Sequence, residues 1–293
     1  VNLLGYSQTP KWFTQAITLF QDFIAFVIPV CVFLFFSKQK ITDLVPHERI
    51  DFKNVIYIVG LAILVMPLMN ILGVIASIFV NTSVSNEIVN DINELSFSLG
   101  LISLAVLPAI CEEVVFRGIV MTGYKKVSPF VAIMVSSLFF GFMHQNLYQF
   151  SYAALTGVFL GFLVYFTNSI YASILAHFII NGSQVLATKL ALMDNSQAIM
   201  ESLKQPLSKT DILAQLAGSF FFAILTLPFF ILLFYKFAKR NKASSARYVL
   251  CSSSKELYVK LNDVEKKDKI VDIYFIGIVI ITIAIFIATS FLA

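Results

Sequence analysis

Long apolar runs dominate this chain and restrict it to helical membrane folds. A spanning helix needs about 20 mostly apolar residues, and only a helix satisfies its own backbone hydrogen bonds within one segment in hydrocarbon. We therefore predict an all-α fold, a polytopic transmembrane helical bundle with about eight membrane-spanning helices. These are expected at Trp12–Phe36, Asn54–Val80, Leu95–Tyr124, Ser128–His144, Gln149–Thr167, Ser169–Leu190, Ile212–Phe237 and Ile270–Leu292.

Composition favours one membrane domain over soluble domains. The chain of 293 residues is 58% hydrophobic and 13% charged, with a mean hydropathy of +0.85, whereas a soluble domain carries about 25% charged residues. The net charge of +4 is no sign of nucleic-acid binding, because most cations lie in short loops beside apolar runs. We predict that residues 1–293 form a single transmembrane domain in a lipid bilayer, with no nucleic-acid partner. The first apolar run has no small-residue cleavage site, so we expect a retained helix rather than a signal peptide.

The distribution of cations predicts the orientation. The connections 38–53, 125–126 and 236–269 hold 16 of the 21 Lys and Arg residues, while the positions expected on the other side hold four. By the positive-inside rule these three connections face the cytosol and the N-terminus lies outside. The long polar stretch 238–269 is then a cytosolic insert between the last two helices. We expect a multi-pass protein of a bacterial plasma membrane.

Ionisable side chains within the apolar runs are the main functional signal. The third run contains Glu112, Glu113 and Arg117, the fourth ends at His144, and the sixth contains His177. Each such group costs roughly 2.5–3.5 kcal/mol at the centre of a spanning helix. Five of them on three segments predict a shared site inside the membrane.

Their spacing suggests individual roles. Glu113 and Arg117 are four residues apart, with the acid on the N-terminal side, which is the favourable order for a helical ion pair. Glu112 is rotated about 100° from Glu113, has no obvious local partner, and suits a general base. His177 and Asn181 share one helix face. The imidazole can ligate a metal or hold a water, and the amide can donate to a developing oxyanion.

Two further features bear on the same region. Pro108 is expected to kink the third helix one turn before the glutamate pair. At about 1.5 Å per residue, the polar positions on the three helices are compatible with one layer of the bilayer. We therefore predict that residues 95–190 contain the catalytic core helices.

Three motifs in this order resemble those of the CPBP intramembrane proteases. They read Glu-Glu-x-x-x-Arg, then Phe-x-x-x-His, then His-x-x-x-Asn, each on a membrane helix. The family includes the CAAX proteases and bacteriocin-processing enzymes, and is related to the Ras-converting endopeptidase. The resemblance covers about Leu95–Leu190, a third of the chain. The matching residues are Glu112, Glu113, Arg117, Phe140, His144, His177 and Asn181.

The resemblance implies a role for each motif residue. Glu112 would activate the attacking water, Glu113 would support it and pair with Arg117, and Asn181 would stabilise the oxyanion. His144 and His177 would bind zinc or position the water.

The resemblance leaves the cofactor open. Glu112, His144 and His177 are a chemically reasonable zinc set, but their spacing is not that of a His-Glu-x-x-His helix, and the motifs do not settle whether a metal is bound.

The predicted function is that of an intramembrane endopeptidase. Its partner would be a membrane-associated or lipid-modified peptide or protein substrate, of the CAAX type or of the bacteriocin or pheromone type. One alternative is a non-proteolytic scaffold of membrane complexes or a bacteriocin self-immunity protein. Another is a transporter with a proton relay through Glu112 and His144, although the sequence shows none of the inverted repeats common in that class.

Two smaller features have structural interpretations. Gly157 and Gly161 form a G-x-x-x-G pattern, which indicates close helix packing within the bundle. Asp22 is an acid in the first apolar run, and it either lines a cavity or marks an interfacial start of that helix.

Overall fold

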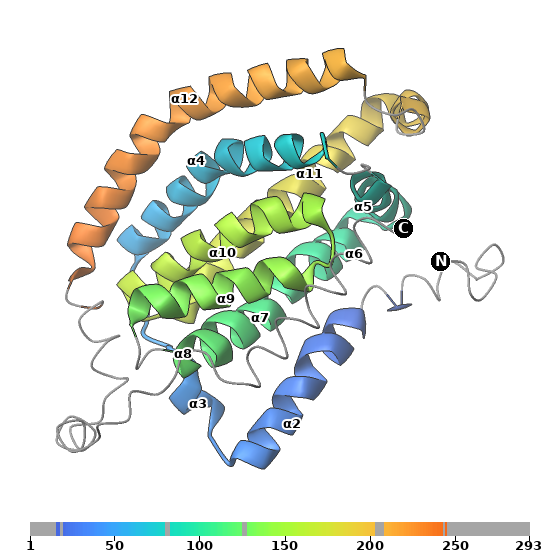
Figure 1. Ribbon diagram of the computed structural model, residues 1–293. Coiled ribbons are helices and arrows are strands. Elements are labelled where there is room, and N and C mark those ends of the chain that lie inside the picture. Colours follow the sequence, from blue (N-terminus) through green and yellow to red (C-terminus); the bar gives the residue numbers. More distant parts are fainter. Residues whose placement is uncertain are drawn as a thin grey trace.

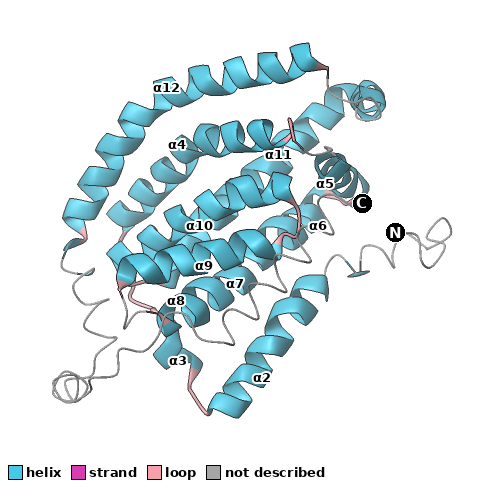
Figure 2. Ribbon diagram, in the orientation of Figure 1, coloured by secondary structure: helices cyan, strands magenta, loops and turns pink. Residues whose placement is uncertain are grey.

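The structure is a bundle of helices that lie side by side (Figure 1). The computed structural model describes residues 16–17, 20–79, 83–124, 128–202, 208–242 and 244. Within these ranges the chain forms helices and loops, with a single isolated bridge between His47 and Ser169 (Figure 2). In the described part of the chain, six helices are long and apolar enough to cross a membrane. The chain is therefore an integral membrane protein of the predicted all-α class.

The element bounds follow local signals. Ser or Asn side chains cap the N-termini of α6, α9, α10 and α12, and Asp51 caps α4 by accepting a hydrogen bond from the backbone N–H of Asn54 at 2.8 Å. The helices are α2 (Ile28–Ser37), α3 (Ile41–Leu44), α4 (Phe52–Ala76), α5 (Ser83–Glu94), α6 (Phe97–Leu101), α7 (Leu107–Glu113), α8 (Met121–Gly123), α9 (Pro129–Met143), α10 (Leu147–Thr167), α11 (Ile170–Ser202) and α12 (Lys209–Arg240). Three π-helical segments, Phe23–Val27, Ile102–Val106 and Val114–Val120, join them.

Seven of the eight predicted helices have counterparts. Six are the candidate spans, and the predicted helix at Ser128–His144 is the shorter apolar helix α9. The predicted helix Ile270–Leu292 and the insert 238–269 lie outside the described residues, except for the positions up to 242 and 244. Helix α5 was not predicted, because its polar sequence resembles a loop; in the structure Ile88, Val89 and Ile92 line a cavity.

The main core lies between α4, α10, α11 and α12. It contains fully buried aliphatic side chains from α4 and α10, small residues from α11, and the ring of Phe237 from α12. The small residues are Ala172 and Ala176, which allow α11 to approach α4 and α10 closely. Without a hydrophobic driving force between helices in lipid, close packing of this kind holds the bundle together.

The G-x-x-x-G pattern packs α10 against α9, as predicted. A Cβ atom on Gly157 would lie 2.9 Å from Cα of Ser137, and one on Gly161 would lie 2.9 Å from Cγ2 of Ile133. Backbone cannot move out of the way as a flexible side chain can. The two helices are therefore as close at Gly157 as a missing side chain permits.

Substitution of Gly157 is expected to be costly. Gly157→Ala should lower the free energy of unfolding by about 1–3 kcal/mol, because overpacking forces α9 and α10 apart. Gly218→Ala is the matched control, since a Cβ there meets nothing within 4 Å and Ala favours a helix. Unfolding of both variants in mixed micelles measures the difference, and equal stability would contradict the packing argument.

Described residues in or beside the connections predicted on the cytosolic side lie together at one end of the bundle. The backbone N–H of Glu48 donates to Asn168 at 3.1 Å, and Thr122 Oγ1 donates to the carbonyl of Leu44 at 2.7 Å. The guanidinium of Arg240 pairs with Asp51 at the same end. This arrangement agrees with the predicted alternation of the helices.

Helix α12 is attached to α4 by polar contacts near both ends. The amides of Asn54 and Asn241 exchange hydrogen bonds at 2.9 and 3.1 Å. At the other end Asn70 Nδ2 donates to Ser219 Oγ at 2.8 Å. Pro228 lies within the helix between these contacts, and α12 bends over α4 (Figure 1).

Candidate active site

The helix that carries the glutamate pair changes geometry on both sides of it. The span Phe97–Gly123 is π-helical at Ile102–Val106 and again at Val114–Val120, with α7 between. Pro108 has no N–H to donate to the carbonyl of Leu104, one turn earlier. The amide of Asn181 on α11 donates to that carbonyl at 3.2 Å. The proline thus frees the acceptor that holds Asn181 against this helix. Single π-turns within α-helices are frequent at functional sites.

Glu113 is the centre of a buried ionic network. Its Oε1 accepts from Nη1 of Arg117 at 2.8 Å and lies 2.9 Å from Nδ1 of His177. Arg117 also donates from Nη2 to the carbonyl of Gly157 at 3.2 Å. The side chains of Glu113 and Arg117 are both fully buried. The predicted ion pair is therefore present, and it connects three helices.

The contact with Glu113 determines which nitrogen of His177 carries the proton when the ring is neutral. A carboxylate beside a guanidinium only accepts hydrogen bonds, so Nδ1 of His177 carries the proton in the neutral ring. Its Nε2 then presents a lone pair, 3.8 Å from Oε2 of Glu112. Unlike Glu113, Glu112 is not paired with Arg117, and only 8% of its surface is exposed.

His144 enters the site from the end of α9. Gln145 adopts a left-handed conformation with φ 56°, which ends the helix immediately after His144. Nδ1 of His144 lies 3.0 Å from the carbonyl of Phe140. Because a carbonyl only accepts, Nδ1 carries the proton and Nε2 is left unprotonated in the neutral ring. Both histidines therefore present acceptor nitrogens.

The ring of Phe140 separates and orients these groups. The guanidinium carbon of Arg117 lies 4.4 Å from the ring centroid, a cation–π contact. The imidazoles of His144 and His177 contact the same ring edge-on, at centroid distances of 5.3 and 5.8 Å. The motif phenylalanine thus positions both histidines and covers the ion pair.

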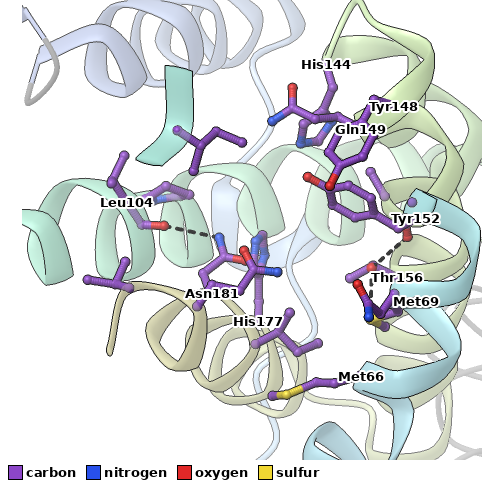
Figure 3. Close-up of a pocket in the computed structure, with 18 of the residues that line it drawn as sticks. Met66, Met69, Leu104, His144, Tyr148, Gln149, Tyr152, Thr156, His177 and Asn181 are labelled. Atoms are coloured by element: carbon purple, nitrogen blue, oxygen red, sulfur yellow. Dashed lines mark hydrogen bonds between the residues drawn. The ribbon is translucent and has the colours of Figure 1, made fainter. Parts of the chain in front are cut away.

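A cavity of about 970 Å³ opens onto these residues. Glu112, His144, His177 and Asn181 line it, whereas Glu113 and Arg117 lie behind its wall and are absent from its lining. Figure 3 shows His144 across the cavity from His177 and Asn181. The structure thus brings the six predicted residues into one region, four on the surface of the cavity and two in support; their catalytic roles remain predictions.

Sequence reasoning did not identify one wall of the cavity. Tyr148, Gln149 and Tyr152 at the start of α10 line it (Figure 3). Tyr148 and Tyr152 are four residues apart, and their rings meet edge-on at 5.8 Å. The only signal in the sequence was the polar and aromatic character of the first turns of this helix.

The types of side chain fit the zinc set suggested from the sequence, but the distances between them in the structure do not. Glu112, His144 and His177 offer a carboxylate and two unprotonated imidazole nitrogens, which are ordinary zinc ligands. Glu113 would also hold His177 in the manner of an outer partner of a metal ligand. However, among the described residues no three His, Cys, Asp or Glu side chains are close enough to hold one ion.

Comparison with known families points to the same segment. Residues 94–183 match the family model of type II CAAX prenyl endopeptidase Rce1-like proteins. The resemblance inferred from the three motifs is thus confirmed over this segment, which contains all seven motif residues. The Rce1-like match runs from the end of α5 into the middle of α11 and leaves the flanking helices unassigned. No curated protein matches the chain, and no solved structure does.

Proposed function

We propose that this protein is an intramembrane endopeptidase whose attacking water is activated by Glu112. The observation that carries the proposal is that only one of the two glutamates is held in an ion pair with Arg117. Glu113 is paired with Arg117 and His177, whereas Glu112 faces the cavity with its Oε2 3.8 Å from Nε2 of His177. A general base must lie within reach of the proton that it takes and must not be held in an ion pair, and Glu112 meets both conditions better than Glu113 does. The match to an endopeptidase family supports the reaction class.

The geometry supports a sequence of proton transfers that needs only side chains of this chain. A water about 2.8 Å from both Oε2 of Glu112 and Nε2 of His177 fits their 3.8 Å separation. Glu112 takes a proton from this water as the oxygen attacks the carbonyl carbon of the scissile peptide. When the tetrahedral intermediate collapses, the carbon–nitrogen bond breaks and Glu112 gives that proton to the leaving amine.

Asn181 is the proposed oxyanion donor. One of its two amide hydrogens is used by the carbonyl of Leu104, which fixes the orientation of the amide. The second hydrogen is available to the carbonyl oxygen of a substrate in the cavity. His144 is less suited to this role in its neutral form, because the nitrogen it presents is an acceptor.

The substrate class follows from the surroundings of the cavity. The cavity lies between helices that span the membrane, and its walls combine apolar side chains with amides and tyrosines. A membrane-associated or lipid-modified peptide or protein suits such a cavity better than a soluble peptide. We place the protein in a bacterial plasma membrane, with the loops rich in Lys and Arg in the cytosol.

New protein N-termini provide the test. Membranes of null cells that express the wild type or Glu112→Gln at matched levels are compared by mass spectrometry. Termini that occur only with the wild type would establish proteolysis and name the substrates and the cut sites. Identical termini would remove the protease proposal and leave a binding role, as a scaffold or an immunity protein.

Asn181→Ala is expected to lower the cleavage rate by about 10²- to 10³-fold, the usual effect of losing one oxyanion donor. Asn181→Gln is the companion variant, since it keeps the amide but displaces it by one methylene. The measurement is single-turnover cleavage of an identified substrate, with binding determined separately. An unchanged single-turnover rate in Asn181→Ala would assign the oxyanion to another group.

Metal content is a separate question with its own experiment. Elemental analysis of the purified protein, with and without chelation, is compared with that of a His177→Ala variant. Zinc bound in a stoichiometric amount and lost in the variant would support the set predicted from the sequence.

A further inference from the structure

Asp22 is a buried acid that the proposed chemistry does not use. It lies in the first span, immediately before the π-helical segment Phe23–Val27. Only 8% of its surface is exposed, and among the described residues its Oδ2 has no hydrogen-bond partner. An unsatisfied buried polar group is costly in any protein. The Oδ2 atom is therefore available to a ligand that can donate a hydrogen bond.

Asp22 faces the same cavity as Glu112. Both line it, and they are near enough to interact electrostatically. The sequence left open whether Asp22 lines a cavity or begins a helix at the interface; the structure decides for the cavity.

The described lining of this cavity has acidic side chains but no permanent cation. It includes Asp22, Glu112 and the two histidines, with no Lys or Arg among the described residues that form it. The nearby Arg117 is fully buried and already pairs with Glu113. A ligand that brings a positive charge would therefore meet two acidic side chains and no Lys or Arg among the described residues of the lining.

We propose that Asp22 is a specificity residue that binds a cationic side chain, Lys or Arg, of a peptide held beside Glu112. This extends the proposed function, because it assumes a peptide in the cavity. Asp22 supplies the charge partner, so Glu112 remains free to accept a proton from water. A Lys or Arg side chain also has an apolar stem suited to the apolar part of the cavity wall.

The test measures binding without cleavage. The Glu112→Gln protein in lipid nanodiscs is titrated with fluorescent peptides that carry an acyl anchor and one Lys, moved position by position. A second series has norleucine, which keeps the stem without the charge, in place of Lys. At one or two positions Lys should be preferred about tenfold or more, the usual range for hydrogen bonds to charged groups. Adding Asp22→Asn should bring the preference close to one, and adding Asp22→Glu should restore part of it.

A matched control makes the same change elsewhere. Asp43 is exposed in α3, so Asp43→Asn should keep the preference for Lys. The inference is overturned if no position prefers Lys, if the preference survives Asp22→Asn, or if no peptide of either series binds saturably.

Failure of the protease proposal would look different. A preference for Lys that depends on Asp22, together with no cleavage by the wild type, would retain the binding site and remove the enzyme. Where cleavage occurs, the cut sites of the wild type should have Lys or Arg at a fixed distance, and those of Asp22→Asn should not.

Discussion

Glu112→Gln is expected to lower the rate of peptide cleavage by about 10²- to 10⁴-fold, the contribution typical of a general base. The amide has the size and shape of the carboxylate but cannot take a proton from water. Glu112 makes no ion pair with Arg117 like that of Glu113, so the fold should not change. Single-turnover cleavage of a substrate identified from its new N-terminus provides the measurement.

The matched control for this variant is Glu94→Gln, which removes an exposed carboxylate at the end of α5. It should cleave at the rate of the wild type. If the Glu112→Gln protein, folded and bound to substrate, retained a rate within a few fold of the wild type, the attacking water would need another base.

Arg117→Met is expected to lower the free energy of unfolding by about 3–5 kcal/mol, the effect of leaving one charge of a buried ion pair without its partner. The remaining Glu113 would be fully buried without the guanidinium that balances its charge. Adding Glu113→Gln should recover much of the loss, because it removes the unbalanced charge. The free energies of unfolding of the wild type, Arg117→Met and the double variant are measured in mixed micelles with increasing amounts of a denaturing detergent.

Arg240→Met is the control on the other ion pair. Arg240 and Asp51 are partly exposed at the end of the bundle, and such pairs contribute about 0–1 kcal/mol. A loss as large for Arg240→Met as for Arg117→Met would show that burial is not the cause. A double variant less stable than Arg117→Met alone would show that the two charges act independently.

Much of the bundle was predictable because each helix must satisfy its own backbone in hydrocarbon. The long apolar runs therefore located seven helices, and the distribution of Lys and Arg predicted on which side of the membrane each connection lies. The pairing of Glu113 with Arg117 was also predictable, since residues four apart on a helix meet. The estimated depths of His144 and His177 were compatible with one layer of the bilayer, and in the structure both imidazoles contact the ring of Phe140.

The rest depends on contacts between segments that are distant in the chain. Nothing local indicates that Asn181 takes the carbonyl freed by Pro108, or that the first helix brings Asp22 to the cavity of Glu112. Helix α5 was missed for a related reason. Its few apolar side chains line the wall of the cavity, a contact that the local sequence does not reveal.

The two attachments of α12 have a geometric consequence. Asn54 and Asn70 are about 24 Å apart along α4, whereas their partners Asn241 and Ser219 are about 33 Å apart along α12. A longer rod joined to a shorter one at both ends must form an arch, and Pro228 lies between the joints, where a helix bends most easily. Ser219 and its neighbour Gly218 line the cavity. The height of this arch, and with it the room available to a substrate, is therefore determined by the difference between two helix lengths.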